Sequence, residues 1–362
     1  MFRSLDQYKP DIHKTIGIME KTYNDALKHK GGNVTLRTLS QSDLEPFSAM
    51  DLTKYNYKDK KRDYAEELCR LLSHSFEVRR NVDDNMIPSV APNLGIADYA
   101  AFIGGEIEFH KDTSWFRPIL QEISDYRKLP KLGTAFWYKN FLDICEEILK
   151  LSSESGIPFL RGFYSPLDLA GALRGEAIYT DFYEYPDELR SLLDYCSEAT
   201  ITFAEDIYAL ARKYLKGSRY GMWFLDGCIY MSEDIACMIS PKLYREYCAP
   251  YTQKVIDHFG VGHMHSHSRA LYLVKEICSL DNVASLWIAT DPNQPRPIDN
   301  IETLIKDARG VCLAIDCSEF LEIEQNFPEM MQGNVSICLP VNTTEEAEKM
   351  VAEFELLQGR FS

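Results

Sequence analysis

The sequence contains no run of about 18 consecutive apolar residues, which excludes a helix of the usual length for crossing a membrane. Its first residues, MFRSLDQYKPDIHK, lack the apolar core of a signal peptide. The ten cysteines, spread from Cys69 to Cys338, include no CxxC pair, and this distribution favours reduced, mostly buried thiols over a disulfide framework. These absences together predict a soluble, cytoplasmic protein.

Basic residues are also scarce. The sequence has 39 Lys and Arg residues against 55 Asp and Glu residues, which gives a formal net charge of −16. Its dense basic run, KDKKR at 58–62, is short and is followed by acidic residues. Because a surface of this charge repels polyanions, nucleic acid is not expected as a partner.

Nucleotide-binding signatures are absent as well, since no GxGxxG or GxxxxGK[ST] follows a predicted strand. No internal repeat, low-complexity tract or Pro/Ser-rich linker divides the 362 residues, and α/β barrels reach this length as one unit. We therefore expect a single structural domain. Residues 1–85 are predicted to form a helical layer packed on the barrel, and the barrel itself is predicted to span residues 86–362.

Apolar runs and amphipathic stretches alternate through the second part. The predicted strands are 156–163, 220–227, 261–267, 283–289, 310–316 and 334–340. The predicted helices are 136–155, 187–215, 240–259, 269–280, 298–308 and 343–357. Six strand–helix units with room upstream for two more favour an α/β fold of the closed (β/α)8 TIM-barrel type over a doubly wound sheet.

The stretch GHMHSHS at 262–268 concentrates histidine, which occurs only eight times in the chain. Side chains alternate faces along a strand, so His263, His265 and His267 point to the same side. A polar ladder of this kind belongs at the C-terminal mouth of a barrel, where barrel enzymes place their active sites. Burying imidazoles without a metal or other partners is costly, so the ladder predicts a metal site, with a solvated turn as the alternative.

A catalytic zinc usually takes three protein ligands and leaves one position open for water or substrate. His265 and His267 are the predicted ligands from the ladder. Cys338, near the end of the last predicted strand, is the candidate for the third, because all strand ends of a closed barrel meet at one rim. The alternative interpretation of Cys338 is a buried core thiol.

Carboxylates cluster after another predicted strand. Asp226, Glu233 and Asp234 precede a helix that Ser240 and Pro241 open with a strong N-cap signal, so they are predicted to lie on a loop above the barrel. They are candidates for general acid/base catalysis, substrate orientation or a further metal contact. A solvated acidic loop is the alternative.

Polar residues at other strand ends are candidates for substrate binding. Asn93 and Tyr164 are predicted to donate hydrogen bonds to a substrate, and His263 is grouped with them. Asp291 lies in the sequence DPN, which is typical of a turn, and is predicted to have no more than that role.

Five stretches resemble a known family. They are IPSVAPNLG…AAFIGGEIEF (87–109), GFYSPLDLAGALRGE (162–176), DGCIYMSEDIACMISPKLYREYCAPY (226–251), GHMHSHSRALYLVKEI (262–277) and SICLPVNTTEEAEKMV (336–351). Over most of the chain from about residue 85, they resemble the uroporphyrinogen decarboxylase superfamily of (β/α)8 barrels. That superfamily includes decarboxylases and zinc-dependent, corrinoid-linked methyltransferases.

The resemblance is closest to the methyltransferase branch, whose zinc ligands are a His-x-Cys pair and a later Cys. In the register set by the next helix, His265 takes the His position, His267 replaces the first Cys and Cys338 takes the second. The replacement removes one thiolate charge and leaves a more Lewis-acidic metal. The resemblance also implies methylcobalamin as co-substrate on a partner corrinoid protein, and a small thiol or methylated compound as substrate.

The decarboxylase branch fits less well. Its enzymes clamp a polycarboxylate with arginines of an R-Q-A-G-R-Y type segment, which the sequence lacks, and its tyrosine before the long helix corresponds to Ala172. Two alternatives to methyl transfer remain open. One is a decarboxylase-like lyase that acts on a small carboxylated substrate without metal, and the other is a non-catalytic corrinoid- or metal-binding barrel.

Overall fold

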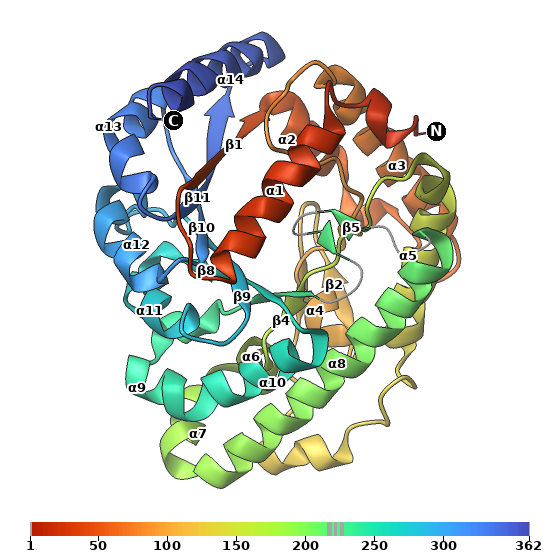
Figure 1. Cartoon of the computed structure of the whole chain (residues 1–362). Coiled ribbons are helices and arrows are strands. Elements are labelled where there is room, and N and C mark those ends of the chain that lie inside the picture. Colours follow the sequence, from red (N-terminus) through yellow and green to blue (C-terminus); the bar gives the residue numbers. More distant parts are fainter. Residues whose placement is uncertain (1, 216–218, 221–222, 225–227, 362) are drawn as a thin grey trace.

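The structure, a computed structural model, describes residues 2–215, 219–220, 223–224 and 228–361. Seven parallel strands form one sheet in the order β1-β11-β10-β9-β8-β7-β4 (Figure 1). Their bounds are β1 Asn33–Ser40, β4 Phe163–Tyr164, β7 Ile229–Ser232, β8 Gly262–His267, β9 Val283–Ala289, β10 Cys312–Asp316 and β11 Asn334–Val341. Two short antiparallel pairs stand apart from this sheet, β2 (Ile107–Phe109) with β3 (Ser114–Phe116) and β5 (Arg219–Tyr220) with β6 (Trp223–Phe224).

An eighth segment closes the sheet. Val90 forms a parallel bridge with Phe159, just before β4. On its other side, the main-chain N–H of Asn85 donates to the Leu36 carbonyl of β1, and the Asn85 side chain accepts from the Leu36 N–H. The segment that holds Asn85 and Val90 therefore fills the gap between β1 and β4. The predicted (β/α)8 barrel is confirmed.

Helices surround the barrel in Figure 1. The α-helices are α1 Ile12–Ala26, α2 Gln41–Ala49, α3 Lys61–Val78, α4 Asp98–Ala101, α5 Phe136–Ser152, α6 Pro166–Arg174, α7 Ile178–Glu184, α8 Pro186–Leu215, α9 Pro241–Leu243, α10 Ala249–Phe259, α11 Val274–Ile277, α12 Ile301–Ala308, α13 Phe320–Met330 and α14 Thr344–Gly359. Two 3-10 segments lie at the strand ends used below, η6 (Ile235–Met238) and η8 (Ser268–Leu273). A π-helical turn, Tyr244–Cys248, joins α9 to α10.

The N-terminal region departs from the sequence expectation at one place. Residues 33–40, expected within the helical layer, form β1, which pairs with β11 from Asn33↔Asn334 to Ser40↔Val341. Helical periodicity on both sides, now α1 and α2, hid this strand in the sequence. The surrounding α1, α2 and α3 are helical, as expected for this layer, but the first barrel strand belongs to the region assigned to it.

The predicted strand at 220–227 is the other difference. Residues 221–222 and 225–227 lie outside the described residues, and the described neighbours form the β5–β6 pair. The barrel strand is β7, immediately downstream. An aromatic run and a buried strand have the same composition, so the sequence could not separate them. The predicted strands from 261 onward correspond to β8, β9, β10 and β11.

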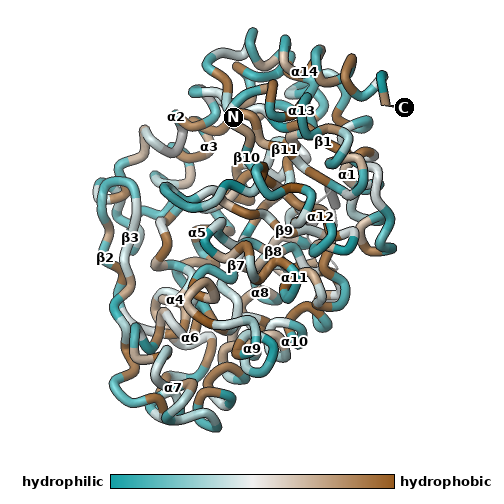
Figure 2. The backbone as a smooth tube through the Cα atoms, turned by 90° about the vertical axis from the view of Figure 1, so that its left-hand side faces the viewer, coloured by the Kyte–Doolittle hydropathy of each residue, from teal (hydrophilic) through white to brown (hydrophobic). Residues whose placement is uncertain are grey.

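The core lies inside and around the barrel. Figure 2 shows strands β7 to β11 passing through the middle of the molecule, with helices on the outside. Helix α1 contacts β9, β10 and β1 and lies across the strands in Figure 1. In the part of the chain that the structure describes, no helix is both long and apolar enough to cross a membrane.

Candidate metal centre

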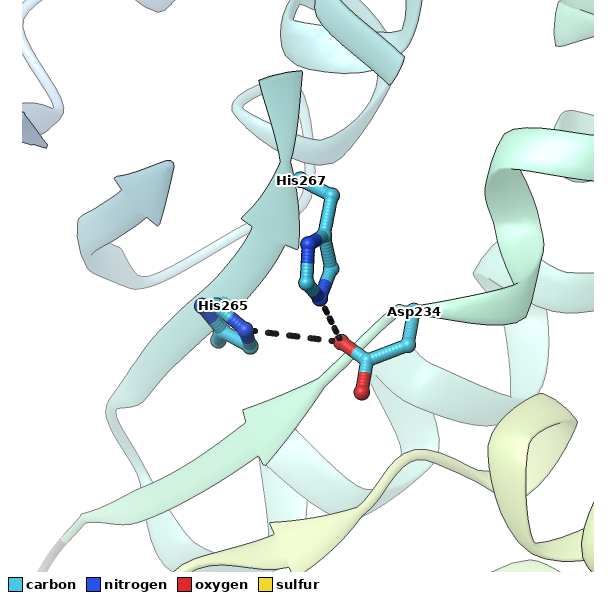
Figure 3. A group of neighbouring side chains, drawn as sticks. All are labelled: Asp234, His265 and His267. Carbon is cyan, nitrogen blue, oxygen red and sulfur yellow. Dashed lines mark ion pairs between the residues drawn. The ribbon is translucent and has the colours of Figure 1, made fainter. Parts of the chain in front are cut away.

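Three side chains converge at the end of β8. Asp234, His265 and His267 each offer one ligand atom, and these atoms all lie within 4.8 Å of one another. Oδ1 of Asp234 is 3.5 Å from Nε2 of His265 and 3.5 Å from Nε2 of His267. Figure 3 shows both imidazoles, from one strand, turned toward the carboxylate that follows the neighbouring strand. The predicted convergence of His265 and His267 at one end of the barrel agrees with this geometry.

The local sequence explains this arrangement. His265 and His267 alternate with Ser266 along β8, so both side chains leave the strand on one face. β7 runs parallel to β8 with Ser232 opposite His265, and the Glu233 N–H continues the ladder by donating to the His265 carbonyl at 2.8 Å. Asp234 is the next residue, so its side chain emerges directly beside the two imidazoles.

The donor set fits a divalent transition metal. Zinc bonds to imidazole nitrogen and carboxylate oxygen at about 2.0–2.2 Å, so two ligand atoms of a tetrahedral zinc lie about 3.4 Å apart. The 3.5 Å separations between Asp234 and the two histidines match that edge. They are also longer than a normal hydrogen bond, and Oδ1 of Asp234 is a buried atom without a hydrogen-bond partner among the described residues.

A second carboxylate holds one of the imidazoles. Nδ1 of His267 lies 2.9 Å from Oδ1 of Asp291, which leaves Nε2 to face Asp234. Asp291 is itself fixed by Ser268, whose hydroxyl accepts from the Asp291 N–H, and it accepts from the Arg269 main chain. A carboxylate behind a metal-binding histidine orients the ring and raises its basicity. Asp291 does begin a turn, as expected, since its carbonyl accepts from the Gln294 N–H at 3.3 Å; its contact with His267 is what the sequence did not reveal.

The two imidazoles differ in electrostatic environment. Burial lowers the pKa of His265, so this ring is neutral at pH 7 and its lone pair is available to a metal. The carboxylates of Asp234 and Asp291 raise the pKa of His267. A metal that bound Nε2 of His267 would therefore compete with a proton for that nitrogen.

Glu233, predicted to act at the mouth beside Asp234, instead points toward the helices outside the barrel, α6 and α10. It is fully buried, and its carboxylate accepts hydrogen bonds from the hydroxyls of Ser165, Tyr244 and Thr252. Burial raises the pKa of Glu233 to about 7. The π-helical turn that carries Tyr244 lies just before Pro250, which has no N–H to continue a regular helix. The contacts of Glu233 thus join β7 to α6 and α10.

Cys338 is not part of the group that the structure brings together. It lies on β11, three strands from β8 in the sheet order, and neighbouring strands are about 4.8 Å apart. Measured along the sheet, the backbone of Cys338 therefore lies about 14 Å from the strand that carries the histidines. Asp234, in contrast, follows the strand adjacent to it. The predicted triad of His265, His267 and Cys338 is replaced in the structure by Asp234, His265 and His267. Burial raises the pKa of the Cys338 thiol.

Cys338 has charged neighbours on both adjacent strands. It stands opposite Arg37 of β1 and Asp316 of β10, and residues in register share a face of the sheet. The same face includes Trp287, whose ring packs against His265 with centroids 4.3 Å apart, because Trp287 pairs with Ala314 two residues before Asp316. Arg37 and Asp316 therefore face the barrel interior, as the histidines do.

Arg37 is a functional candidate that the sequence did not reveal. Its Nε is buried and has no hydrogen-bond partner among the residues that the structure describes. Burial raises the pKa of Tyr230 on β7 and of Cys338, and the Arg37 guanidinium opposes that rise in both. Only the recognition of residues 33–40 as a barrel strand could have placed this arginine in the interior.

The remaining predicted site residues lie elsewhere. His263 is fully buried, with Nδ1 2.8 Å from the Ser285 hydroxyl and its ring edge-on to Tyr23 of α1, so it belongs to the closed end of the barrel. The Asn93 main chain exchanges hydrogen bonds with the Tyr64 hydroxyl. Tyr164 stacks on Tyr99, and its hydroxyl donates to the Ile96 carbonyl. Asp226 lies outside the described residues.

One of three comparisons with known proteins, the match to a family model, supports the fold. The profile of the family described as Uroporphyrinogen decarboxylase (URO-D) matches residues 94–358. A comparison with curated proteins finds no match. Among solved structures, the chain is similar to the homocysteine methyltransferase MmuM from Escherichia coli in its apo form, with 13% identity, a TM-score of 0.25, and coverage of 48% of this chain and 87% of that one. A likeness at that level carries no argument.

Proposed function

The chain belongs to the uroporphyrinogen decarboxylase family, and from this premise we propose that it is a zinc-dependent methyltransferase. The reaction would move a methyl group between a corrinoid and a small thiol or similar acceptor. The observation that carries the proposal is the convergence of Asp234, His265 and His267 on one point. A decarboxylase that works without metal has no need of two imidazole nitrogens that each lie 3.5 Å from one carboxylate oxygen.

Each residue has a distinct proposed role. His265, His267 and Asp234 would hold zinc through two nitrogens and one oxygen, and Asp291 would keep the His267 ring in place. Bound zinc would hold an acceptor sulfur as thiolate at neutral pH, the form that attacks a methyl carbon. Three protein ligands leave one position of a tetrahedral ion for that sulfur.

The strand across the barrel from the histidines, β1, suggests a second chemical group on the acceptor. β1 and β8 are four strands apart in the sheet order, so in an eight-stranded barrel they face each other across the interior. Arg37 on β1 therefore faces the histidines, and a buried guanidinium nitrogen that has no partner among the described residues favours an anionic ligand. We propose an acceptor with a thiol at one end and an anionic group at the other. The methyl-bearing corrinoid is proposed to arrive on a partner protein.

Metal analysis tests this proposal directly. The purified protein should bind one zinc per chain, and His267→Ala should lose it, because the variant removes one of two imidazole ligands. Cys338→Ser is the matched variant that decides the third ligand. If Asp234 completes the site, Cys338→Ser retains zinc and Asp234→Ala loses it, whereas the reverse result would restore the sulfur as ligand.

Turnover is a separate measurement. Methylcobalamin should lose its methyl–cobalt absorption band in the presence of zinc-loaded protein and an anionic thiol, and Arg37→Gln should raise the KM for that thiol more than it lowers kcat. A protein that binds zinc but leaves the absorption band unchanged with every thiol would be a binding barrel rather than a methyltransferase.

A decarboxylase-like lyase is the second candidate, and one observation favours it. Arg37 and Asp316 flank Cys338 in the barrel interior, and burial raises the pKa of the Asp316 carboxyl. An arginine beside a carboxyl group whose pKa is raised suits the binding and protonation of a carboxylated substrate. Release of CO2 that persists after chelation of all metal would support this function over methyl transfer.

A further inference from the structure

The turn that carries Asp234 is held by a residue from another element, Asp168 of α6. The Asp168 carboxylate accepts from the Asp234 N–H at 2.8 Å through one oxygen and from the Ile235 N–H at 3.0 Å through the other. It also accepts from the Ser232 hydroxyl at the end of β7. Asp168 is 3% exposed, so water does not compete for these bonds.

Asp168 is fixed by its position in the helix. Ser165 is the N-cap of α6, and its hydroxyl accepts from the Asp168 N–H at 3.2 Å. The same hydroxyl donates to Glu233. The first turn of α6 thus hydrogen-bonds to both Glu233 and Asp234. The Glu233 side chain points toward the helices, and the Asp234 side chain points toward the imidazoles.

We propose that Asp168 is a positioning residue for the metal centre, because its carboxylate sets the direction in which Asp234 leaves the end of β7. The inference rests on the proposed function, since it concerns the same site. Asp168 touches neither substrate nor metal. Its carboxyl group is not a ligand of the proposed metal. It orients one ligand, Asp234, through hydrogen bonds to the main chain, and residues behind a metal site tune affinity in this way.

The substitution Asp168→Asn tests this role. An amide presents one oxygen and one NH2 group, so it cannot accept from the Asp234 and Ile235 N–H groups through two separate oxygens, as the Asp168 carboxylate does. Zinc affinity, measured by competition with a chelator, should fall at least about tenfold. Asp181→Asn is the matched control. Asp181 is 1% exposed and is paired with Arg174 at 2.9 Å, so this variant also replaces a buried, hydrogen-bonded carboxyl group but should leave zinc affinity unchanged.

Hydrogen exchange separates this inference from the proposed function. The main-chain amides of Asp234 and Ile235 should be protected in the metal-free wild-type protein, and their exchange should accelerate in Asp168→Asn but not in Asp181→Asn. Equal zinc affinity in the two variants would overturn the inference, as would rapid exchange of these amides in the wild type. A wild-type protein that binds no zinc would instead remove the proposed function, and the exchange data would still decide whether Asp168 holds the turn.

Discussion

The two ends of β8 place histidine in opposite environments, one buried and one partly exposed. His263, at the beginning of the strand, is fully buried between Ser285 and Tyr23, and burial lowers its pKa to about 3. His267, at the end of the strand on the same face, is partly exposed between two carboxylates that raise its pKa. The alternation of side chains along β8 places both histidines on one face, but their different depths in the barrel give them different exposure and opposite pKa shifts.

The two histidines differ in the side chains that face their ring nitrogens, which is the difference on which the proposed metal site depends. His263 contacts the Ser285 hydroxyl and the edge of the Tyr23 ring, and burial keeps its imidazole neutral, as expected of a core residue. His267 has Asp234 in front of one ring nitrogen and Asp291 behind the other. We therefore expect substitutions at the closed end of β8 to change mainly the stability of the fold, and substitutions at the open end to change mainly ligand binding.

The largest expected effect is on folding. His263→Ala should lower the free energy of unfolding by about 3 kcal/mol, because it leaves a cavity beside Tyr23 and removes the partner of the Ser285 hydroxyl. Zinc affinity should remain that of the wild type. Urea unfolding and chelator competition measure the two quantities. Loss of zinc in this variant at unchanged stability would contradict the division between the two ends.

The next effect is on the open end. Asp291→Asn should lower zinc affinity about 10- to 100-fold, because the His267 ring loses the carboxylate that orients it. The unfolding free energy of the metal-free protein should change far less than in His263→Ala, since Asp291 belongs to a loop beyond the strand end. A variant with wild-type zinc affinity would show that His267 needs no such support.

The smallest effect is a dependence on pH. The lowered pKa of His263 means that the unfolded chain binds a proton between pH 6.5 and pH 3 that the folded protein does not. His263 therefore destabilises the metal-free fold as pH falls below about 6.5, by about 1 kcal/mol between pH 6 and pH 5. His263→Gln keeps a hydrogen-bonding side chain and should remove that part of the slope. An unchanged slope would place the proton uptake elsewhere.

Much of the barrel could be predicted from the sequence, and the failures have physical causes. β9 agrees with its predicted range, and β8 and β11 differ from theirs by one residue, because buried parallel strands leave continuous apolar runs. β1 was missed because its pairing partner is β11, at the other end of the chain. Contacts between such distant segments leave no local signal.

The candidate site divides in the same way. The alternation of residues in GHMHSH was enough to place His265 and His267 side by side. The third member could not be predicted, because Glu233 and Asp234 are adjacent carboxylates and the choice between them depends on which helices hold the turn. Three hydroxyls take Glu233 away from the mouth, and the contacts of Asp168 leave Asp234 facing the imidazoles.

The sequence by itself determined the class of fold, the strand that carries the histidines and the face to which they point, since all three follow from short-range periodicity. The tertiary structure decided which carboxylate meets the imidazoles, which histidine is sealed in the core and which arginine faces the interior. The physical reason is that ligand geometry and burial depend on neighbouring strands. In a parallel barrel those neighbours lie tens or hundreds of residues apart in the chain.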